Sequence, residues 1–148
     1  MSIWTHVTGA IRIDSSSTID DISYTRAFEE IFGKVLKYDS PSSVWEEAEL
    51  CKDLFTPYGS EGGIEYYIYV NPDGFSMDKY AVLIIGDLRD YINTEEIVEW
   101  FNKILYDHGL LIRDAVLSID VEGIERKVVS YDQEKGEQAF QNWLTWKS

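Results

Sequence analysis

The stretch "YAVLIIGDLRDYINTEEIVEWF" at residues 80–101 contains the junction that decides the fold. Its first half is an apolar run typical of a buried strand, and its second half has apolar residues at helical spacing. Asn93 stands three residues before Glu96, and this capping-box pattern predicts where the helix begins. The predicted buried face of the helix comprises Ile97, Trp100, Phe101, Ile104 and Leu105. We therefore predict a strand over residues 79–86 and a loop, "GDLRDY" at residues 86–91, that leads into the helix.

The residues before this junction predict two further strands and a helix. Residues 3–13 alternate between two faces, as expected of a half-buried strand. One face carries Ile3, Val7, Ile11 and Ile13. The other face carries Trp4, His6, Thr8 and Arg12. Residues 19–38 predict a helix and residues 63–70 a strand, with residues 39–62 as an insertion that contains one short helix within 42–56.

The residues after the junction complete the pattern. Residues 110–121 and 124–131 each predict a strand, and residues 137–146 predict a short tail helix. The order is β-α-β-β-α-β with an extra strand and a tail helix, which is the order of a ferredoxin-like fold. We therefore predict a single α+β domain over residues 1–148, with an antiparallel sheet and two helices on one face. Its two parts are a core and a C-terminal addition, residues 1–121 and 122–148.

The composition limits the classes of function. The chain carries 27 acidic and 13 basic residues, which gives a formal net charge of −14 at pH 7. Because nucleic acid would be repelled and no run of Lys or Arg is present, direct nucleic-acid binding is not predicted. The acidic excess is greatest between Glu61 and Glu99. The single Cys51 cannot form an internal disulfide, and no apolar stretch is long enough to span a membrane, so we expect a cytoplasmic protein.

Two short motifs have a structural and a functional interpretation. In "GDLRDY", the aspartates can satisfy backbone donors of a turn while Arg89 pairs with a nearby carboxylate. Alternatively, Arg89 between Asp87 and Asp90 forms a polar pocket at the end of a strand. The "GSEGG" motif at residues 59–63 is no phosphate-binding loop, because it precedes a strand and contains Glu61. It remains a candidate rim of a binding site.

The second face of the predicted sheet is rich in aromatic and polar residues. It would carry Trp4, His6, Thr8, Arg12, Glu65, Tyr67 and Tyr69. Open aromatic sheets of this kind stack bases in RNA-binding domains, but the negative charge of this chain opposes that use. We expect the C-terminal strand and the tail helix, with Trp143 and Trp146, to cover part of this face. A small-ligand pocket and a homodimer interface are the two alternatives.

Catalytic motifs are not found. His6 and His108 are the only histidines, and neither stands in a motif with a nucleophile or with metal ligands. Asp87 and Asp90 are spaced so that they can bind a divalent ion, but in so acidic a chain such a pair is expected by chance. We therefore predict no enzyme, no cofactor and no metal.

Three stretches carry a resemblance: "MSIWTHVTGAIRID" (1–14), "YGSEGGIEYYIYVNPD" (58–73) and "IIGDLRDY" (84–91). They resemble segments of small uncharacterised accessory proteins carried by phages and prophages of Gram-positive bacteria. The resemblance covers residues 1–121 as an overall pattern and includes no catalytic motif, so it transfers no functional residue. It implies an accessory factor, and some proteins of this kind block host immunity.

Two hypotheses follow from this context and from the charge. In the first, the protein inhibits a host defence component, as an anti-CRISPR protein or a nucleic-acid mimic does, because its carboxylates occupy a basic groove built for phosphates. The predicted partner-binding residues are Glu61, Asp87, Asp90, Glu95, Glu96 and Glu99. In the second, the protein sequesters a small nucleotide immune signal. The predicted ligand-binding residues are then Trp4, His6, Arg12, Tyr67, Tyr69 and Arg89.

Overall fold

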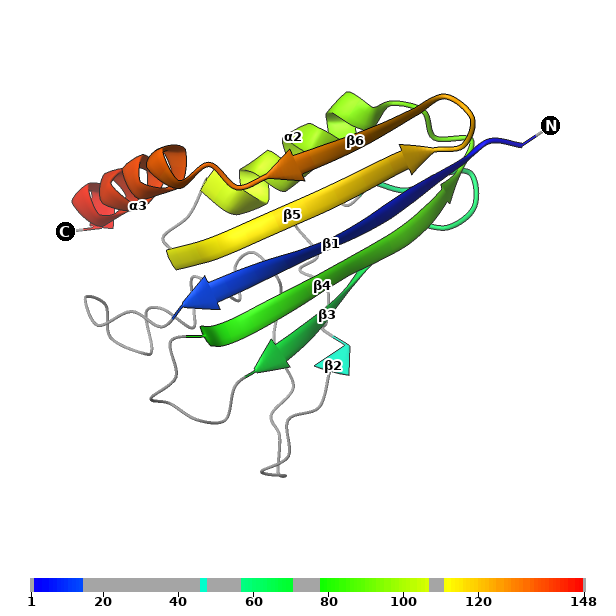
Figure 1. Cartoon of the computed structure of the whole chain (residues 1–148). Coiled ribbons are helices and arrows are strands. Elements are labelled where there is room, and N and C mark those ends of the chain that lie inside the picture. Colours follow the sequence, from blue (N-terminus) through cyan, green and yellow to red (C-terminus); the bar gives the residue numbers. More distant parts are fainter. Residues whose placement is uncertain (1, 15–45, 48–56, 71–77, 107–110, 148) are drawn as a thin grey trace.

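A six-stranded sheet and two helices make up the described part of the chain (Figure 1). The computed structural model describes residues 2–14, 46–47, 57–70, 78–106 and 111–147. In their order across the sheet the strands are β2 (Glu46–Glu47), β3 (Ile64–Val70), β4 (Asp78–Arg89), β1 (Trp4–Asp14), β5 (Leu111–Val121) and β6 (Glu125–Ser130). The helices are α2 (Thr94–Tyr106) and α3 (Gln133–Lys147). All neighbouring strands are antiparallel, which confirms the predicted α+β class and antiparallel sheet.

The first strand of the chain is central in this sheet. β1 pairs with β4 on one side, where Trp4 lies opposite Arg89, and with β5 on the other, where Thr5 lies opposite Val121. Its side chains alternate as predicted, with Val7, Ile11 and Ile13 fully buried on one face. Thr8, Ala10 and Arg12 are exposed on the other face. The apolar residues of β1 therefore form the middle of the core.

Helix α2 covers the buried face of the sheet. The side-chain oxygen of Asn93 accepts a hydrogen bond from the backbone N–H of Glu96, 3.4 Å away, which confirms the predicted N-cap. The predicted apolar face of this helix is buried, with Phe101 as the largest fully buried side chain in the described residues. An apolar stripe of this kind is stabilised by packing against the sheet, since an isolated helix of this length would be marginal.

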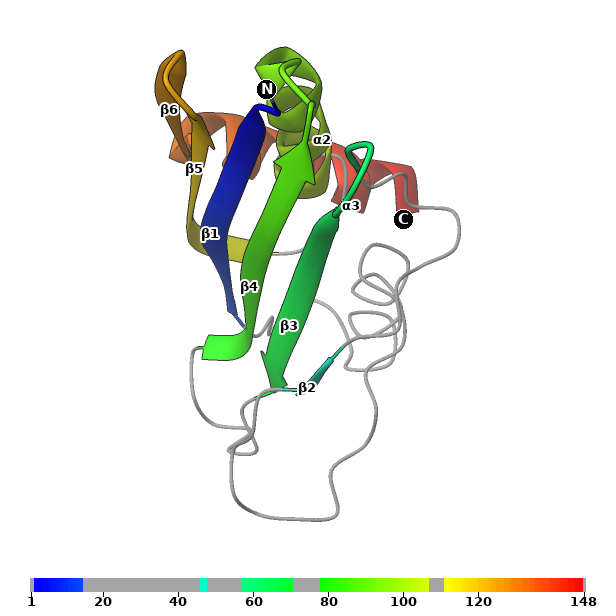
Figure 2. The ribbon, with the colours of Figure 1, turned by 90° about the vertical axis from the view of Figure 1, so that its right-hand side faces the viewer.

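The C-terminal elements differ from the expectation that they cover the second face. Strand β6 extends the sheet at its edge, and α3 runs from the end of β6 toward the side of the sheet that carries α2 (Figure 2). The rings of Tyr106 and Tyr131 stack there with centroids 5.7 Å apart, and Lys135 Nζ lies 4.5 Å from the centre of the Tyr106 ring. Phe140 is also buried. The predicted cover is therefore wrong, because these apolar contacts hold α3 beside α2.

The loop predicted for "GDLRDY" is also wrong in part. β4 continues to Arg89, so only Asp90 and Tyr91 follow the strand. The reason is pairing with distant segments: Leu88 and Arg89 lie opposite Thr5 and Trp4 of β1, and on the other side the Arg89 N–H donates to the Glu61 carbonyl over 2.9 Å. Similarly, Glu46 and Glu47, in a region predicted as a short helix, pair with β3 as the strand β2.

The helix predicted over residues 19–38 lies outside the described residues. The described sheet has an additional strand at each edge, β2 and β6, compared with the four strands of a ferredoxin-like core. Within the described residues, neither helix has the length and apolar character needed to cross a membrane.

A buried hydroxyl ties β1 to the segment between β4 and α2. Thr5 is fully buried, and its Oγ1–H donates to the backbone carbonyl of Tyr91. Thr5→Val keeps the side-chain shape but leaves that carbonyl without this donor, so we expect the free energy of unfolding to fall by about 1–3 kcal/mol. Thr8→Val on the exposed face of the same strand is the matched control, expected to change it by less than about 0.5 kcal/mol. Urea unfolding of both variants tests this, and equal losses would contradict it.

Candidate functional site

The face of the sheet opposite α2 is exposed, and we call it the open face. Its exposed residues in five strands are Thr8, Ala10, Arg12, Glu65, Ile85, Asp87, Asp114, Val116, Arg126, Val128 and Ser130. Three apolar side chains on this face have large exposed fractions, 44% for Ile85, 45% for Val116 and 63% for Val128. Large apolar side chains that share one exposed face indicate an interaction surface. In Figure 1 the strands lie in front of α2, so the view is onto this face.

The two motifs that the sequence analysis singled out lie against each other at one end of the open face. The Ser60 N–H donates to the Arg89 carbonyl over 3.0 Å, and the Arg89 N–H donates to the Glu61 carbonyl over 2.9 Å. Gly62 has φ of 76°, a left-handed conformation that glycine adopts without strain. "GSEGG" is therefore a turn that docks on the end of β4, next to "GDLRDY".

Arg89 is paired with groups of the same chain. Its Nη1 lies 3.0 Å from a carboxylate oxygen of Glu61, and its Nε donates to the hydroxyl of Ser2 over 2.9 Å. A carboxylate oxygen of Asp90 lies 3.8 Å from Nε. The predicted pairing of Arg89 with a nearby carboxylate is thus confirmed, whereas Asp87 lies within β4 and bonds the side chain of His6.

Asp90 is a turn residue. Its φ is 56°, a left-handed conformation that aspartate tolerates better than most residues. Its N–H donates to the Ile3 carbonyl over 2.7 Å, and its side-chain oxygen lies 3.2 Å from the Ile3 N–H. Asp90 therefore fastens the start of the chain to the end of β4.

His6 lies between two carboxylates on the open face. Its Nδ1 is 2.5 Å from an Asp87 oxygen, and its Nε2 is 2.6 Å from a Glu122 oxygen. An ionised carboxylate only accepts hydrogen bonds, so both ring nitrogens must carry a proton, as they do only in the imidazolium. The hydrogen bonds to Asp87 and to Glu122 raise the pKa of His6 above its ordinary value of 6.5.

Glu122 is a site residue that the sequence analysis missed. It follows the last residue of β5, and its N–H donates to the Trp4 carbonyl over 3.1 Å. Glu122 and His6 are far apart in the sequence, and only the pairing of β1 with β5 brings them together. No local pattern signals this contact. The one available signal was the strand order, from which a carboxylate at the end of β5 can be placed near the start of β1.

Half of the acidic residues predicted to bind a partner lie together at one end of the open face. We define the acidic end as Glu61, Asp87, Asp90, Asp120 and Glu122. Asp87 and Glu122 share His6, Glu61 and Asp90 share Arg89, and Asp120 lies opposite His6 in the β1–β5 register. The other three predicted acids, Glu95, Glu96 and Glu99, belong to α2 on the opposite side of the sheet. The predicted partner-binding residues therefore belong to two separate groups, one around the end of β4 and one on α2.

The predicted ligand-binding set is also divided. Trp4, His6 and Arg89 lie at the acidic end, whereas Arg12 is near the other end of β1, where its Nε lies 3.3 Å from an Asp114 oxygen. The backbones of Tyr67 and Tyr69 pair with Leu83 and Ala81 of β4. The positions of these two tyrosine side chains are outside the described part of the structure.

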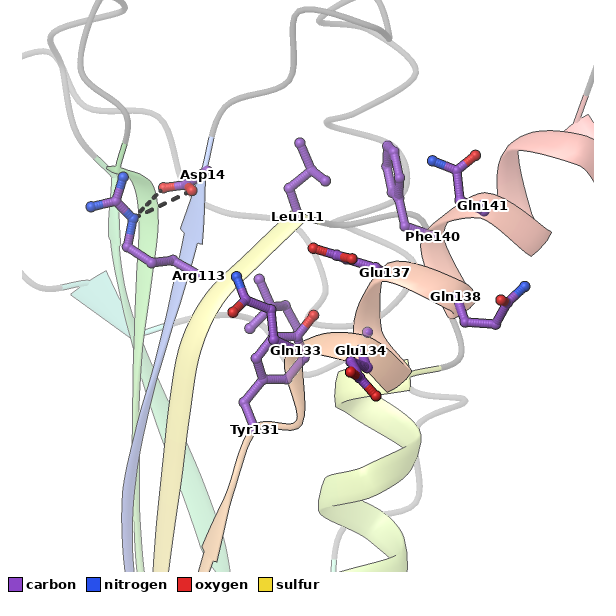
Figure 3. Close-up of a pocket in the computed structure, with 12 residues that line it drawn as sticks. Asp14, Leu111, Arg113, Tyr131, Gln133, Glu134, Glu137, Gln138, Phe140 and Gln141 are labelled. Carbon is purple, nitrogen blue, oxygen red and sulfur yellow. Dashed lines mark hydrogen bonds and ion pairs between the residues drawn. The ribbon is translucent and has the colours of Figure 1, made fainter.

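A groove of about 740 Å³ lies between the start of β5 and α3 (Figure 3). Its polar lining includes Gln133, Glu134, Glu137, Gln138 and Gln141 of α3. At its far side the Nε of Arg113 lies 3.0 Å from an Asp14 oxygen. Tyr131 forms part of the groove wall. Its burial and, to a smaller extent, the nearby Tyr106 raise its pKa, so the phenol remains protonated at neutral pH. The groove is an amide-rich and carboxylate-rich surface without a convergent set of charged groups.

Comparisons with known proteins identify no relative. No family model, no curated protein and no solved structure matches the chain. No catalytic family is thereby identified. Among the residues that the structure describes, no group of three or more His, Cys, Asp or Glu side chains is arranged to hold a metal ion. The two carboxylates beside His6 illustrate the geometry, since they bind opposite nitrogens of the ring and do not converge on one point.

Proposed function

We propose that this chain is a non-enzymatic binding protein that inhibits a nucleic-acid-binding partner through its acidic end. The observation that carries the proposal is the concentration of five carboxylates at one end of the open face, beside exposed apolar side chains. In the context implied by the resemblance, the protein is a phage-type accessory factor in the cytoplasm of an infected bacterium. Its partner is a host defence protein with a basic groove.

The physical basis is complementarity of charge and surface. A partner that binds phosphates presents Arg and Lys, and carboxylates can satisfy these cations in place of phosphate oxygens. The net charge of −14 would accelerate the encounter with such a groove. The neighbouring Ile85 and Val116 supply apolar area, which protein interfaces combine with a polar rim.

The geometry disfavours the nucleotide-binding alternative. A nucleotide phosphate would need cations that are free to bind it, but His6 and Arg89 are each paired with carboxylates of the same chain. An incoming phosphate would also face repulsion from Asp87, Glu61 and Glu122. The Trp4, His6 and Arg89 group therefore suits a cationic partner better than an anionic ligand.

The proposal is tested by capture and competition. The tagged protein is incubated in lysate of a defence-carrying bacterium, repurified and measured by native mass spectrometry, which also reports homodimers. We expect a retained nucleic-acid-binding protein whose nucleic acid is displaced in the complex. A retained protein that binds nucleic acid and this chain at the same time would contradict the proposal, as would a retained small molecule that is released on denaturation.

Charge reversal then locates the surface. The double variant Glu61→Lys/Asp120→Lys changes the acidic end, and Glu95→Lys/Glu99→Lys makes an identical change of net charge on α2. We expect the first variant to weaken partner binding at least about tenfold. The second variant should weaken binding only through the reduced long-range electrostatic attraction between the two proteins. Isothermal titration at two salt concentrations separates the two effects. Equal weakening by both variants would show that only total charge matters and would refute the acidic end as the contact surface.

We also infer that the core is ferredoxin-like. The order of the four long strands, β3-β4-β1-β5, supports this, because each of the two central strands lies between strands from the other half of the chain. On this interpretation β2 and β6 are additions at the two edges of the sheet.

A further inference from the structure

The connection between β5 and β6 is held to β1 by one residue. The Glu122 N–H donates to the Trp4 carbonyl over 3.1 Å, and the Glu122 side chain lies 2.6 Å from Nε2 of His6. Gly123 follows with φ of 70°, and the Ile124 N–H closes the turn on the Val121 carbonyl over 3.0 Å. Through His6 this turn is linked further to Asp87 of β4. The chain of contacts thus crosses three strands on the open face.

We propose that His6 is a proton-operated clamp that regulates the acidic end. In its protonated form it bonds Asp87 and Glu122 at once and neutralises part of their charge. When it loses a proton, the ring keeps a single N–H donor, so one carboxylate is released and the acidic end becomes more negative by one unit. This inference rests on the proposed function for its role in binding, but the clamp itself is a property of the free protein.

Each element that neighbours His6 carries charged groups. They are Asp87 and Arg89 in β4, Asp120 in β5, Glu122 in the following turn, Arg126 in β6, and Glu61 in the loop before β3. Two of these carboxylates bond the ring directly. Arg89 is paired with Glu61, and Arg126 lies opposite Asp120 in the sheet, so neither cation opposes the proton strongly. The raised pKa of His6 agrees with this balance.

The clamp has a direct effect on a basic partner. In the free protein the imidazolium occupies the same carboxylates that a partner's Arg or Lys would use, so it competes with the partner from inside the chain. Binding should therefore strengthen as pH rises through the pKa of His6. Because His6 is 41% exposed and its two partners are more exposed, we expect only a two- to fivefold change, about the effect of one solvent-exposed ion pair.

The clamp is tested first without any partner. NMR titration of the histidine rings gives the pKa of His6, and the variant His108→Gln assigns the two signals. We expect a pKa above 6.5 with both ring nitrogens protonated at lower pH, and a return toward 6.5 in Asp87→Asn/Glu122→Gln. A wild-type value at or below 6.5, or a value that the double variant leaves unchanged, would overturn the clamp.

The regulatory role is tested with an oligo-arginine peptide as the probe. Its affinity is measured at constant ionic strength from about pH 6 to pH 8, across the range in which histidine titrates. We expect affinity to rise through the pKa of His6 in the wild type and to stay level in His6→Gln. Binding without this rise, in a protein whose His6 has the raised pKa, would overturn the regulation alone. Failure of the wild type to bind the peptide at any pH would instead contradict the proposed function and with it the regulation.

Discussion

Phe101→Ala is expected to lower the free energy of unfolding by about 3–5 kcal/mol. Phe101 is fully buried on the face of α2 that packs on the sheet, and it belongs to the same apolar cluster as Val7 and Ile11 of β1. Its removal would leave a cavity between the helix and the central strand, and the rigid sheet cannot collapse to fill it. Since whole domains are stable by only about 5–15 kcal/mol, a large part of the stability would be lost.

Two further substitutions on α2 make this measurement specific. Phe101→Leu keeps much of the side-chain volume and should lower the free energy of unfolding by less than about half as much as Phe101→Ala. Lys103→Ala changes an exposed residue of the same helix and should stay within about 0.5 kcal/mol of the wild type. Unfolding in guanidinium chloride gives all three values. If Phe101→Ala costs less than about 1 kcal/mol, α2 does not pack on the sheet as described.

Gly62→Ala is expected to lower the free energy of unfolding by about 2–5 kcal/mol, the sum of two penalties. The first is the left-handed backbone, with φ of 76°, which an L-residue adopts only with strain. The second is steric, because a Cβ at this position would lie 2.1 Å from the backbone carbonyl oxygen of Asp87. A backbone atom inside a strand cannot yield, so the loop itself must move and take Glu61 away from Arg89.

Gly123→Ala is the matched control for this substitution. Gly123 has a similar φ of 70°, but a Cβ there would have no neighbour within 4 Å. It should therefore show only the backbone penalty, about 1–2 kcal/mol. The difference between the two variants, measured by thermal unfolding, isolates the close approach of the 59–63 loop to β4. Equal losses would mean that this loop does not dock there.

Much of the fold was predictable because its signals are local. The alternation of Val7, Ile11 and Ile13 determines which face of β1 is buried, and the Asn93 cap determines where α2 begins. The extent of β4 was not predictable in this way. Gly86 and Asp87 have the composition of a turn, but pairing with the start of β1 and with the loop at residues 59–63 extends the strand through them. A local sequence pattern does not show which distant segment will pair with a strand.

The candidate site was predictable to a smaller extent for the same reason. His6, Asp87 and Arg89 were selected as candidates, but their contact partners belong to other segments of the chain: His6 bonds Asp87 and Glu122, and Arg89 pairs with Glu61. Glu122 reaches His6 only through the β1–β5 register. Glu95 and Glu99 were grouped with Asp87 because they are close in sequence, although α2 lies on the other side of the sheet. Proximity along the chain was thus a poor guide to a shared surface.

The central position of β1 also has a consequence for synthesis of the protein. This strand is synthesised before both of its neighbours, because Trp4 pairs with Arg89 and Thr5 pairs with Val121. During translation β1 must therefore remain without either neighbour until β4 is made, and without its second neighbour until β5 follows. Contacts between such distant segments make folding slow and leave apolar strands exposed to other chains in the interval. The nascent chain is thus most prone to aggregate before residue 121 has emerged.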